Sequence, residues 1–127
     1  MMRESKPICS LLITNSPEEY SNKVIQEALN ELGSFQIAQG WKPISSLEKT
    51  YDLVVLDIAA SFDPMNVISS IRGANPKVRI IVVSASQHWK EAKAALRAGA
   101  ADYLNKAQNK EEILANLRTI LGLRSEG

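Results

Sequence analysis

Three side chains with reactive or charged ends each follow a short apolar run in this chain. Asp57 ends the run at 53–56, Ser84 ends a β-branched run, and Lys106 follows a third apolar segment. A buried strand that ends on one Asp places the carboxylate where ligands gather in parallel α/β sheets, outside the carboxyl ends of the strands. Asp57 is therefore a candidate site residue, and Lys106 is its expected charged partner, because an opposite charge within about 4 to 6 Å favours both ionised forms.

The elements that must position these residues follow from the hydrophobic pattern. Short apolar runs alternate with longer segments of helical spacing, which predicts βαβ units and a parallel sheet. We expect five strands, at 8–13, 35–39, 52–57, 78–84 and 101–104. The favoured strand order is 2-1-3-4-5, a flavodoxin-like α/β fold with helices on both faces. In that order four strand ends converge on one edge, which carries Thr14, Asn15, Asp57, Ser84 and Lys106.

Five helices are expected between and after these strands. The first is predicted to start at Ser16, with Ser16 and Glu19 as a capping box and Pro17 at the first helical position, and to end at Gly33. A helix opened by Asp63 and Pro64 is expected to end at Gly73. The remaining helices are predicted at 43–49, at 87–98 and after Asn109, where Glu112 completes a second capping box.

Length and composition restrict the class of protein. The 127 residues predict one domain over 1–123 and a tail at 124–127, either a cloning remnant or the start of a linker. Lys and Arg number 15 against 14 Asp and Glu, so no charge excess points to nucleic acid or a membrane surface. Cys9 is the single cysteine, which excludes an internal disulfide and a zinc cluster. We expect a cytoplasmic location, since no apolar run suits a signal peptide or membrane span.

Two other functional classes have less support from the residues. A flavin or nucleotide binder of the same fold needs a loop with free backbone donors after the first strand. The loop at 14–17 contains no Gly and loses one donor to Pro17. A metabolic enzyme lacks a general base, since His88 is the only histidine and is interpreted as a surface residue. Trp89 is either an anchor for a partner or a half-buried aromatic.

Three motifs resemble those of the receiver domains of two-component response regulators. They are the segments 53–57, 80–85 and 98–106, in the right order and at matching strand ends. The resemblance implies that Asp57 accepts a phosphoryl group from a histidine kinase or phosphotransfer protein, and that Ser84 and Lys106 bond phosphoryl oxygens. It also implies that Tyr103 is a switch residue that follows Ser84. These residue types suit phosphoryl transfer, which needs an in-line nucleophile with positive charge and donors around the oxygens.

One departure from the receiver pattern affects the metal. Receivers normally follow the first strand with two acidic residues that hold Mg²⁺, and Thr14 and Asn15 stand there in this chain. Asp57, the amide oxygen of Asn15 and the backbone carbonyl of Ala59 are the remaining expected ligands. Mg²⁺ usually takes one or more carboxylates, so we expect its binding to be weak or absent. Beyond autophosphorylation and autodephosphorylation at Asp57, no enzymatic activity is expected.

The resemblance leaves two modes of action open. In the leading hypothesis the domain is part of a phosphorelay, and phosphorylation of Asp57 changes an output surface. That surface is implied to lie on the helix at 87–98, the strand at 101–104 and the last helix, with Trp89 and Tyr103 as contacts for an output partner. In the alternative, the domain is a pseudo-receiver that docks partner proteins without phosphorylation. The oligomeric state, including a homodimer, and any attached output domain stay open.

Overall fold

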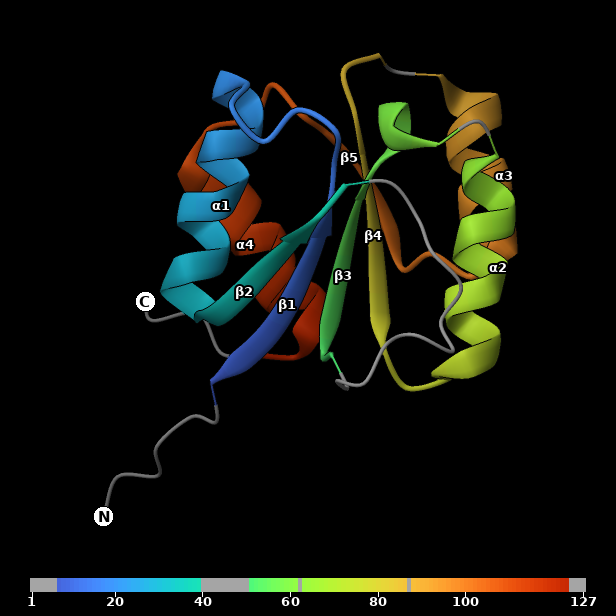
Figure 1. Ribbon diagram of the computed structural model, residues 1–127, viewed down its shortest axis with the longest axis horizontal. Coiled ribbons are helices and arrows are strands. Elements are labelled where there is room, and N and C mark those ends of the chain that lie inside the picture. The colour runs from blue at the N-terminus through green and yellow to red at the C-terminus, as the bar shows by residue number, and fades with distance from the viewer. Residues whose placement is uncertain (1–6, 40–50, 62, 87, 124–127) are drawn as a thin grey trace.

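The computed structural model describes residues 7–39, 51–61, 63–86 and 88–123. Its sheet has five parallel strands in the order β2-β1-β3-β4-β5 (Figure 1), which confirms the predicted flavodoxin-like topology. The strands are β1 (Ile8–Ile13), β2 (Gly33–Ala38), β3 (Leu53–Asp57), β4 (Arg79–Ser84) and β5 (Asp102–Asn105). β1 has the predicted bounds, β3 and β4 each start one residue later than predicted, and β5 is shifted by one residue. β2 starts two residues earlier than predicted because Gly33 already pairs with Ile8.

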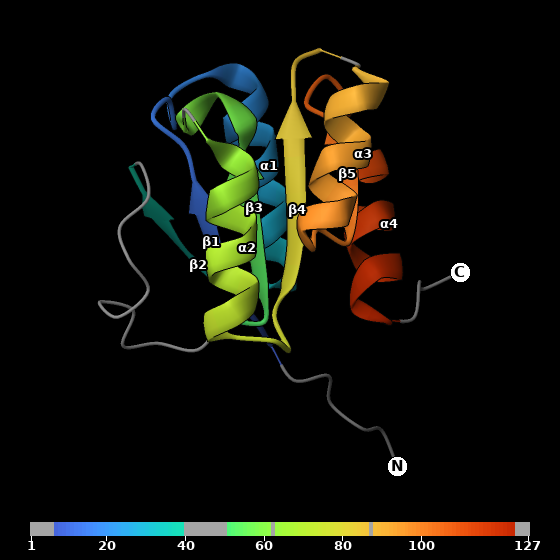
Figure 2. The ribbon, with the colours of Figure 1, turned by 90° about the vertical axis from the view of Figure 1, so that its right-hand side faces the viewer.

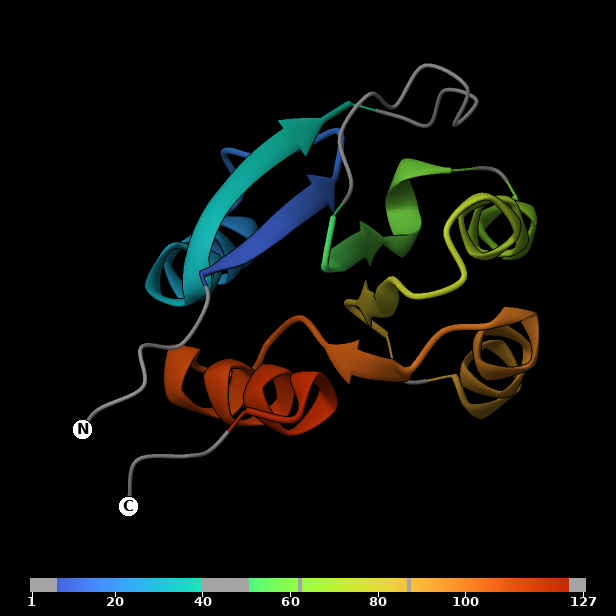
Figure 3. The same cartoon turned by 90° about the horizontal axis from the view of Figure 1, so that it is seen from below.

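Helices cover both faces of the sheet. They are α1 (Tyr20–Leu32), α2 (Pro64–Ala74), α3 (Trp89–Ala98) and α4 (Lys110–Leu121), with a short 3-10 helix, η2 (Ile58–Ala60), after β3. α1 and α4 pack together on one face, and α2 and α3 lie side by side on the other (Figures 2 and 3). Within the described ranges, no helix is long and apolar enough to cross a membrane. The helix predicted at 43–49 and the tail at 124–127 lie outside the described residues.

The sheet separates two hydrophobic clusters. Successive side chains of a strand point to opposite faces, so the central strands supply both clusters and must be apolar throughout. In β3, Val54 and Leu56 pack towards α2 and α3, whereas Leu53 and Val55 pack towards α1 and α4. This two-sided packing fixes the register of β3, and it delivers Asp57 to the carboxyl edge of the sheet.

The start of α1 differs from the prediction, and the predicted capping box at Ser16 is wrong. The helix begins at Tyr20 after Glu19, which makes no side-chain cap hydrogen bond. Ser16 belongs to a turn instead: its N–H donates to Thr14 Oγ1 at 3.1 Å, and its carbonyl accepts from Glu19 N–H at 3.1 Å. The Asn22 amide also donates to the Ser16 carbonyl, at 2.8 Å. These bonds hold Ser16 and Pro17 outside the helix.

Two other predicted helix ends are tested by the structure. Asn109 and Glu112 form the predicted capping box, with the Glu112 N–H donating to Asn109 Oδ1 at 2.8 Å and the Asn109 N–H to Glu112 Oε1 at 3.1 Å. The predicted end of α2 at Gly73 is wrong, because the helix continues to Ala74 and the Asn75 N–H still bonds the Ile71 carbonyl. Gly73 adopts a helical conformation and does not terminate the helix.

Candidate functional site

Asp57 lies at the carboxyl end of β3 and is 2% exposed. Its Oδ2 atom accepts hydrogen bonds from Thr14 Oγ1 at 2.8 Å, from Lys106 Nζ at 2.9 Å and from Asn22 Nδ2 at 3.3 Å. Its Oδ1 atom accepts one from the Ala59 N–H at 3.2 Å. The carboxylate therefore accepts four hydrogen bonds, three at Oδ2 and one at Oδ1.

Lys106 is the charged partner that was predicted for Asp57. The backbone N–H of Lys106 donates to the Ser84 carbonyl at 2.9 Å, which ties the residue after β5 to the end of β4. Its side chain is 8% exposed, and its Nζ reaches both Asp57 Oδ2, at 2.9 Å, and Glu19 Oε1, at 3.3 Å. The ammonium thus lies between two carboxylates. The contact with Glu19 was not predicted, because the spacing of Ser16 and Glu19 indicated a capping box.

Thr14 and Asn22 connect the other donors into one network. Thr14 is fully buried, and its hydroxyl accepts from the Ser16 N–H and from Asn22 Nδ2, each at 3.1 Å, while donating to Asp57. Thr14 therefore has a structural role at this edge, as a residue of the β1–α1 loop. Asn22 is also fully buried, and no hydrogen-bond partner is found for its Oδ1 atom in the described structure.

Sequence reasoning missed Asn22, although the sequence carries a signal for it. Asn22 precedes Ile25 by three residues and Leu29 by seven, so it lies on the apolar face of α1 that points inward. A polar side chain on such a face must find buried partners, because an unpaired buried amide costs about 1 to 3 kcal/mol. In this chain the partners are the residues around Asp57.

The charge state of Asp57 follows from these contacts. Burial raises the pKa of the carboxyl, but the hydrogen bonds from Lys106, Thr14 and the Ala59 N–H, together with the Lys106 charge, outweigh it. The pKa of Asp57 is thus lowered from its ordinary value. Asp57 is therefore ionised at neutral pH.

Ser84 completes the set of strand-end residues. It is 1% exposed and lies opposite Asn105 in the pairing of β4 with β5. Its hydroxyl accepts from the Ser86 N–H at 3.2 Å. Within the described residues no hydrogen bond joins Ser84 to Asp57. Ser84 therefore lies beside the Asp57 and Lys106 pair without being part of its network.

Tyr103 and Trp89 lie on the side of the sheet that α3 covers. The Tyr103 hydroxyl approaches the Ser86 carbonyl at 3.1 Å and Glu91 Oε1 at 2.5 Å. Burial and the hydrogen bond to Glu91 raise the pKa of Tyr103. Trp89 is 70% exposed, so of its two interpretations the half-buried aromatic is wrong. His88 is exposed at the N-cap of α3, as expected for a surface residue.

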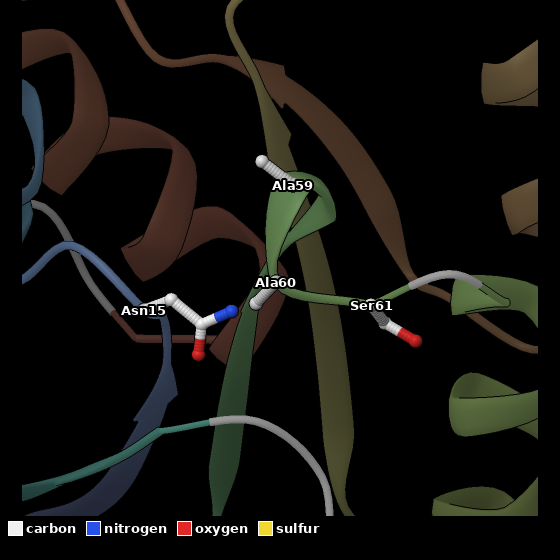
Figure 4. Close-up of a pocket in the computed structure, with 4 residues that line it drawn as sticks. All are labelled: Asn15, Ala59, Ala60 and Ser61. Atoms are coloured by element: carbon white, nitrogen blue, oxygen red, sulfur yellow. The ribbon is translucent and has the colours of Figure 1, made fainter.

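A shallow pocket lies at the mouth of the site (Figure 4). It is lined by Asn15, Ala59, Ala60 and Ser61, so two of the three predicted metal ligands border it. The Asn15 side chain points towards η2 in this view. Across the described residues, no group of three or more His, Cys, Asp or Glu side chains could hold a metal ion. The donors that remain are one carboxylate, one amide and one backbone carbonyl, which suits Mg²⁺ poorly.

The fold and the strand-end site together define a receiver-type signalling domain. The profile of the family described as the response regulator receiver domain matches residues 18–118. The chain belongs to this family, and receiver domains are signalling modules of two-component systems. The matched segment begins at Glu18, after the loop in which Thr14 and Asn15 replace the acidic pair.

Curated and structural relatives agree with this assignment. The transcriptional regulatory protein ZraR of Salmonella typhimurium is 28% identical over 109 residues, which cover 82% of this chain and 25% of ZraR. The chain thus spans about a quarter of that relative. The BeF3-activated DrrB receiver domain superposes with a TM-score of 0.80 at 20% identity, covering 92% of this chain and 99% of DrrB. An orphan response regulator of H. pylori, HP1043, gives 0.75 at 20% identity, covering 90% and 96%.

Proposed function

We propose that Asp57 accepts a phosphoryl group from the phosphohistidine of a histidine kinase or of a phosphotransfer protein. The observation that carries the proposal is the buried ion pair at the sheet edge, in which Lys106 Nζ lies 2.9 Å from Asp57 Oδ2. It brings an ionised carboxylate at the end of β3 and an ammonium just after β5 together at one edge of the sheet, and Ser84 ends β4, the strand between them. These are the groups that phosphoryl transfer requires.

In the proposed reaction an oxygen of Asp57 attacks phosphorus in line with the bond to the histidine nitrogen. The oxygen–phosphorus bond forms as the nitrogen–phosphorus bond breaks, and the electron pair of that bond leaves with the imidazole. Oδ1 is the better placed oxygen, because it has one hydrogen bond whereas Oδ2 has three. Lys106 and Ser84 then donate to phosphoryl oxygens, which stabilises the developing charge.

The metal is the weak point of this site. Asp57, the amide oxygen of Asn15 and the backbone carbonyl of Ala59 would hold Mg²⁺. The bound ion would neutralise the charge on the phosphoryl oxygens. Asp57 is the sole carboxylate of that set, and its Oδ2 is already taken by an ammonium. We therefore propose that Mg²⁺ binds weakly at this site, so that phosphorylation of Asp57 needs millimolar Mg²⁺ concentrations.

The test is incubation with acetyl phosphate over a range of Mg²⁺ concentrations, followed by intact-mass measurement. We expect one added phosphoryl group on the wild-type chain and none on the Asp57→Asn variant. Restoring a carboxylate with Asn15→Asp should lower the Mg²⁺ concentration for half-maximal labelling about tenfold, since ligand charge sets the affinity of such sites. Failure of the wild type to gain mass at tens of millimolar Mg²⁺ would contradict the proposal.

That negative result would favour the alternative, a pseudo-receiver that docks partners without phosphorylation. One observation supports this alternative: the three donors on Oδ2 leave Asp57 satisfied in the resting domain. In both cases we propose that the partner surface is formed by α3, β5 and α4, where Trp89 is exposed. Amide shifts on this surface after addition of beryllofluoride would indicate the phosphorylation switch, and a homodimer would show in the same spectra as slower tumbling.

A further inference from the structure

Glu19 is a second carboxylate that contacts the ammonium of Lys106, in addition to Asp57. The distance from Lys106 Nζ to Glu19 Oε1 is 3.3 Å, and the distance to Asp57 Oδ2 is 2.9 Å. The two carboxylates differ in exposure, since the Glu19 side chain is 54% exposed and that of Asp57 is 3% exposed. A buried cation is thus shared between a fixed inner carboxylate and an outer one that faces the solvent.

Two features fix Glu19 in this place. Asn22 Nδ2 lies 3.5 Å from Glu19 Oε1 and 3.3 Å from Asp57 Oδ2, so the two carboxylates share this amide as well as Lys106. Glu19 is also the N-cap residue of α1, where the free N–H groups of the helix favour a negative charge. The carboxylate of Glu19 is consequently part of the site and does not merely lie near it.

This arrangement has a cost for phosphorylation. An incoming phosphoryl group brings negative charge to a place that already holds two carboxylates. Lys106 must also turn its ammonium towards the phosphoryl oxygens, and so release at least part of its contact with Glu19. Both effects slow phosphorylation. The Glu19 charge repels the phosphoryl oxygens, and it also keeps the Lys106 ammonium from binding them.

We propose that Glu19 is a positioning residue that acts through Lys106 and slows the phosphorylation of Asp57. The inference rests on the proposed function of Asp57. It predicts that removal of the Glu19 charge speeds the reaction, whereas a residue that only stabilised the fold, or that helped to bind Mg²⁺, would slow it when removed.

The experiment compares the rates at which acetyl phosphate labels four chains: the wild type, Glu19→Gln, Glu19→Asp and Glu18→Gln. We expect Glu19→Gln to react about two- to fivefold faster, the range that exposed ion pairs contribute. Glu19→Asp keeps the charge and should stay near the wild-type rate. Glu18→Gln is the matched control, because it removes the same charge from the neighbouring exposed residue, for which no ion pair is found in the described structure. Raising the salt concentration should shrink the difference between Glu19→Gln and the wild type.

Other outcomes separate this inference from the proposed function. If the wild type is labelled and Glu19→Gln reacts at the same rate, the inference is wrong and the role of Asp57 stands. A slower Glu19→Gln variant with a weakened Mg²⁺ response would make Glu19 a metal ligand and would also overturn the inference. If no chain is labelled while the thermal melts of all four agree, both proposals fail.

Discussion

Asp57 and Lys106 are buried as an ion pair, and each charge offsets the cost of burying the other. Asp57 is 2% exposed and Lys106 is 7% exposed, at 2.9 Å between Oδ2 and Nζ. Taking either charge out of water costs several kcal/mol, which is offset only while the partner and the surrounding donors are present. Glu19 alone cannot replace Asp57 for this purpose, because its carboxylate is largely solvated.

Single and double variants should behave differently at this pair. Lys106→Met is expected to lower the free energy of unfolding by about 3 kcal/mol, since it leaves a buried carboxylate without its cation. The double variant Asp57→Asn, Lys106→Met removes both charges and should recover most of that loss. Urea denaturation of the two single variants and the double variant measures the coupling. Additive effects of the two substitutions would contradict this account.

At the scale of elements, β2 depends on the absence of a side chain at its first residue. A Cβ atom added to Gly33 would lie 2.2 Å from the Ile8 carbonyl oxygen and 2.6 Å from the Ile8 nitrogen, both backbone atoms of the paired strand β1. Neither atom can move without separating the strands. Gly33 therefore does more than end α1, because it lets the chain turn directly from the helix into the sheet.

Two glycine substitutions should consequently have opposite effects. Gly33→Ala is expected to destabilise the domain by about 2 kcal/mol or more, through the clash with β1. Gly73→Ala is the matched control: it lies inside α2 with nothing within 4 Å of an added Cβ, so it should stabilise by about 0.5 kcal/mol. Thermal melts of the two variants give the comparison. A loss of stability in Gly33→Ala no larger than that in Gly73→Ala would contradict the role of the contact with Ile8.

The two predicted capping boxes can be tested in the same manner. Asn109→Ala removes a side-chain acceptor that the Glu112 N–H uses at 2.8 Å, and should cost about 1 kcal/mol. Ser16→Ala should cost less than about 0.5 kcal/mol, because the contacts of Ser16 are made by its backbone. Chemical denaturation distinguishes the two losses. If Ser16→Ala lowered the free energy of unfolding as much as Asn109→Ala does, Ser16 would act as a helix cap after all.

At the scale of the whole molecule, the stability should depend on pH through Asp57. Its pKa is lowered in the folded chain, so its contribution is fully present above the unfolded value of about 4 and is lost as the pH falls below it. Urea midpoints measured between pH 7 and pH 3 should therefore fall more steeply for the wild type than for Asp57→Asn. Glu111→Gln, at an exposed position of α4, should retain the wild-type slope. Identical slopes for wild type and Asp57→Asn would contradict the prediction.

The site residues that lie at strand ends could be predicted from the sequence. Continuous apolar runs placed Asp57, Ser84 and Lys106 at one edge, and the parallel topology then required them to converge. The site residues on α1 could not be predicted, because their positions depend on where the helix starts and on which of its faces points inward. Glu19 and Asn22 reach the site because α1 starts at Tyr20, and that start is set by hydrogen bonds that Thr14 and Asn22 make to the backbone of Ser16. These bonds hold Ser16 in a turn before the helix, and the spacing of Ser16 and Glu19 alone does not reveal them, so the capping rule predicted the wrong start.

The polar network around Asp57 joins segments of the chain that are far apart. The bond from Thr14 to Asp57 spans 43 residues, and the bond from Lys106 to Asp57 spans 49. Each contact closes a long loop whose entropy must be overcome before the contact gains free energy, and mixed α/β domains fold more slowly than helical bundles for this reason. A nascent chain that has not yet been synthesised as far as Lys106 leaves Asp57 without its cation, so the carboxylate acquires its native surroundings only after that segment has been made and has folded against the sheet.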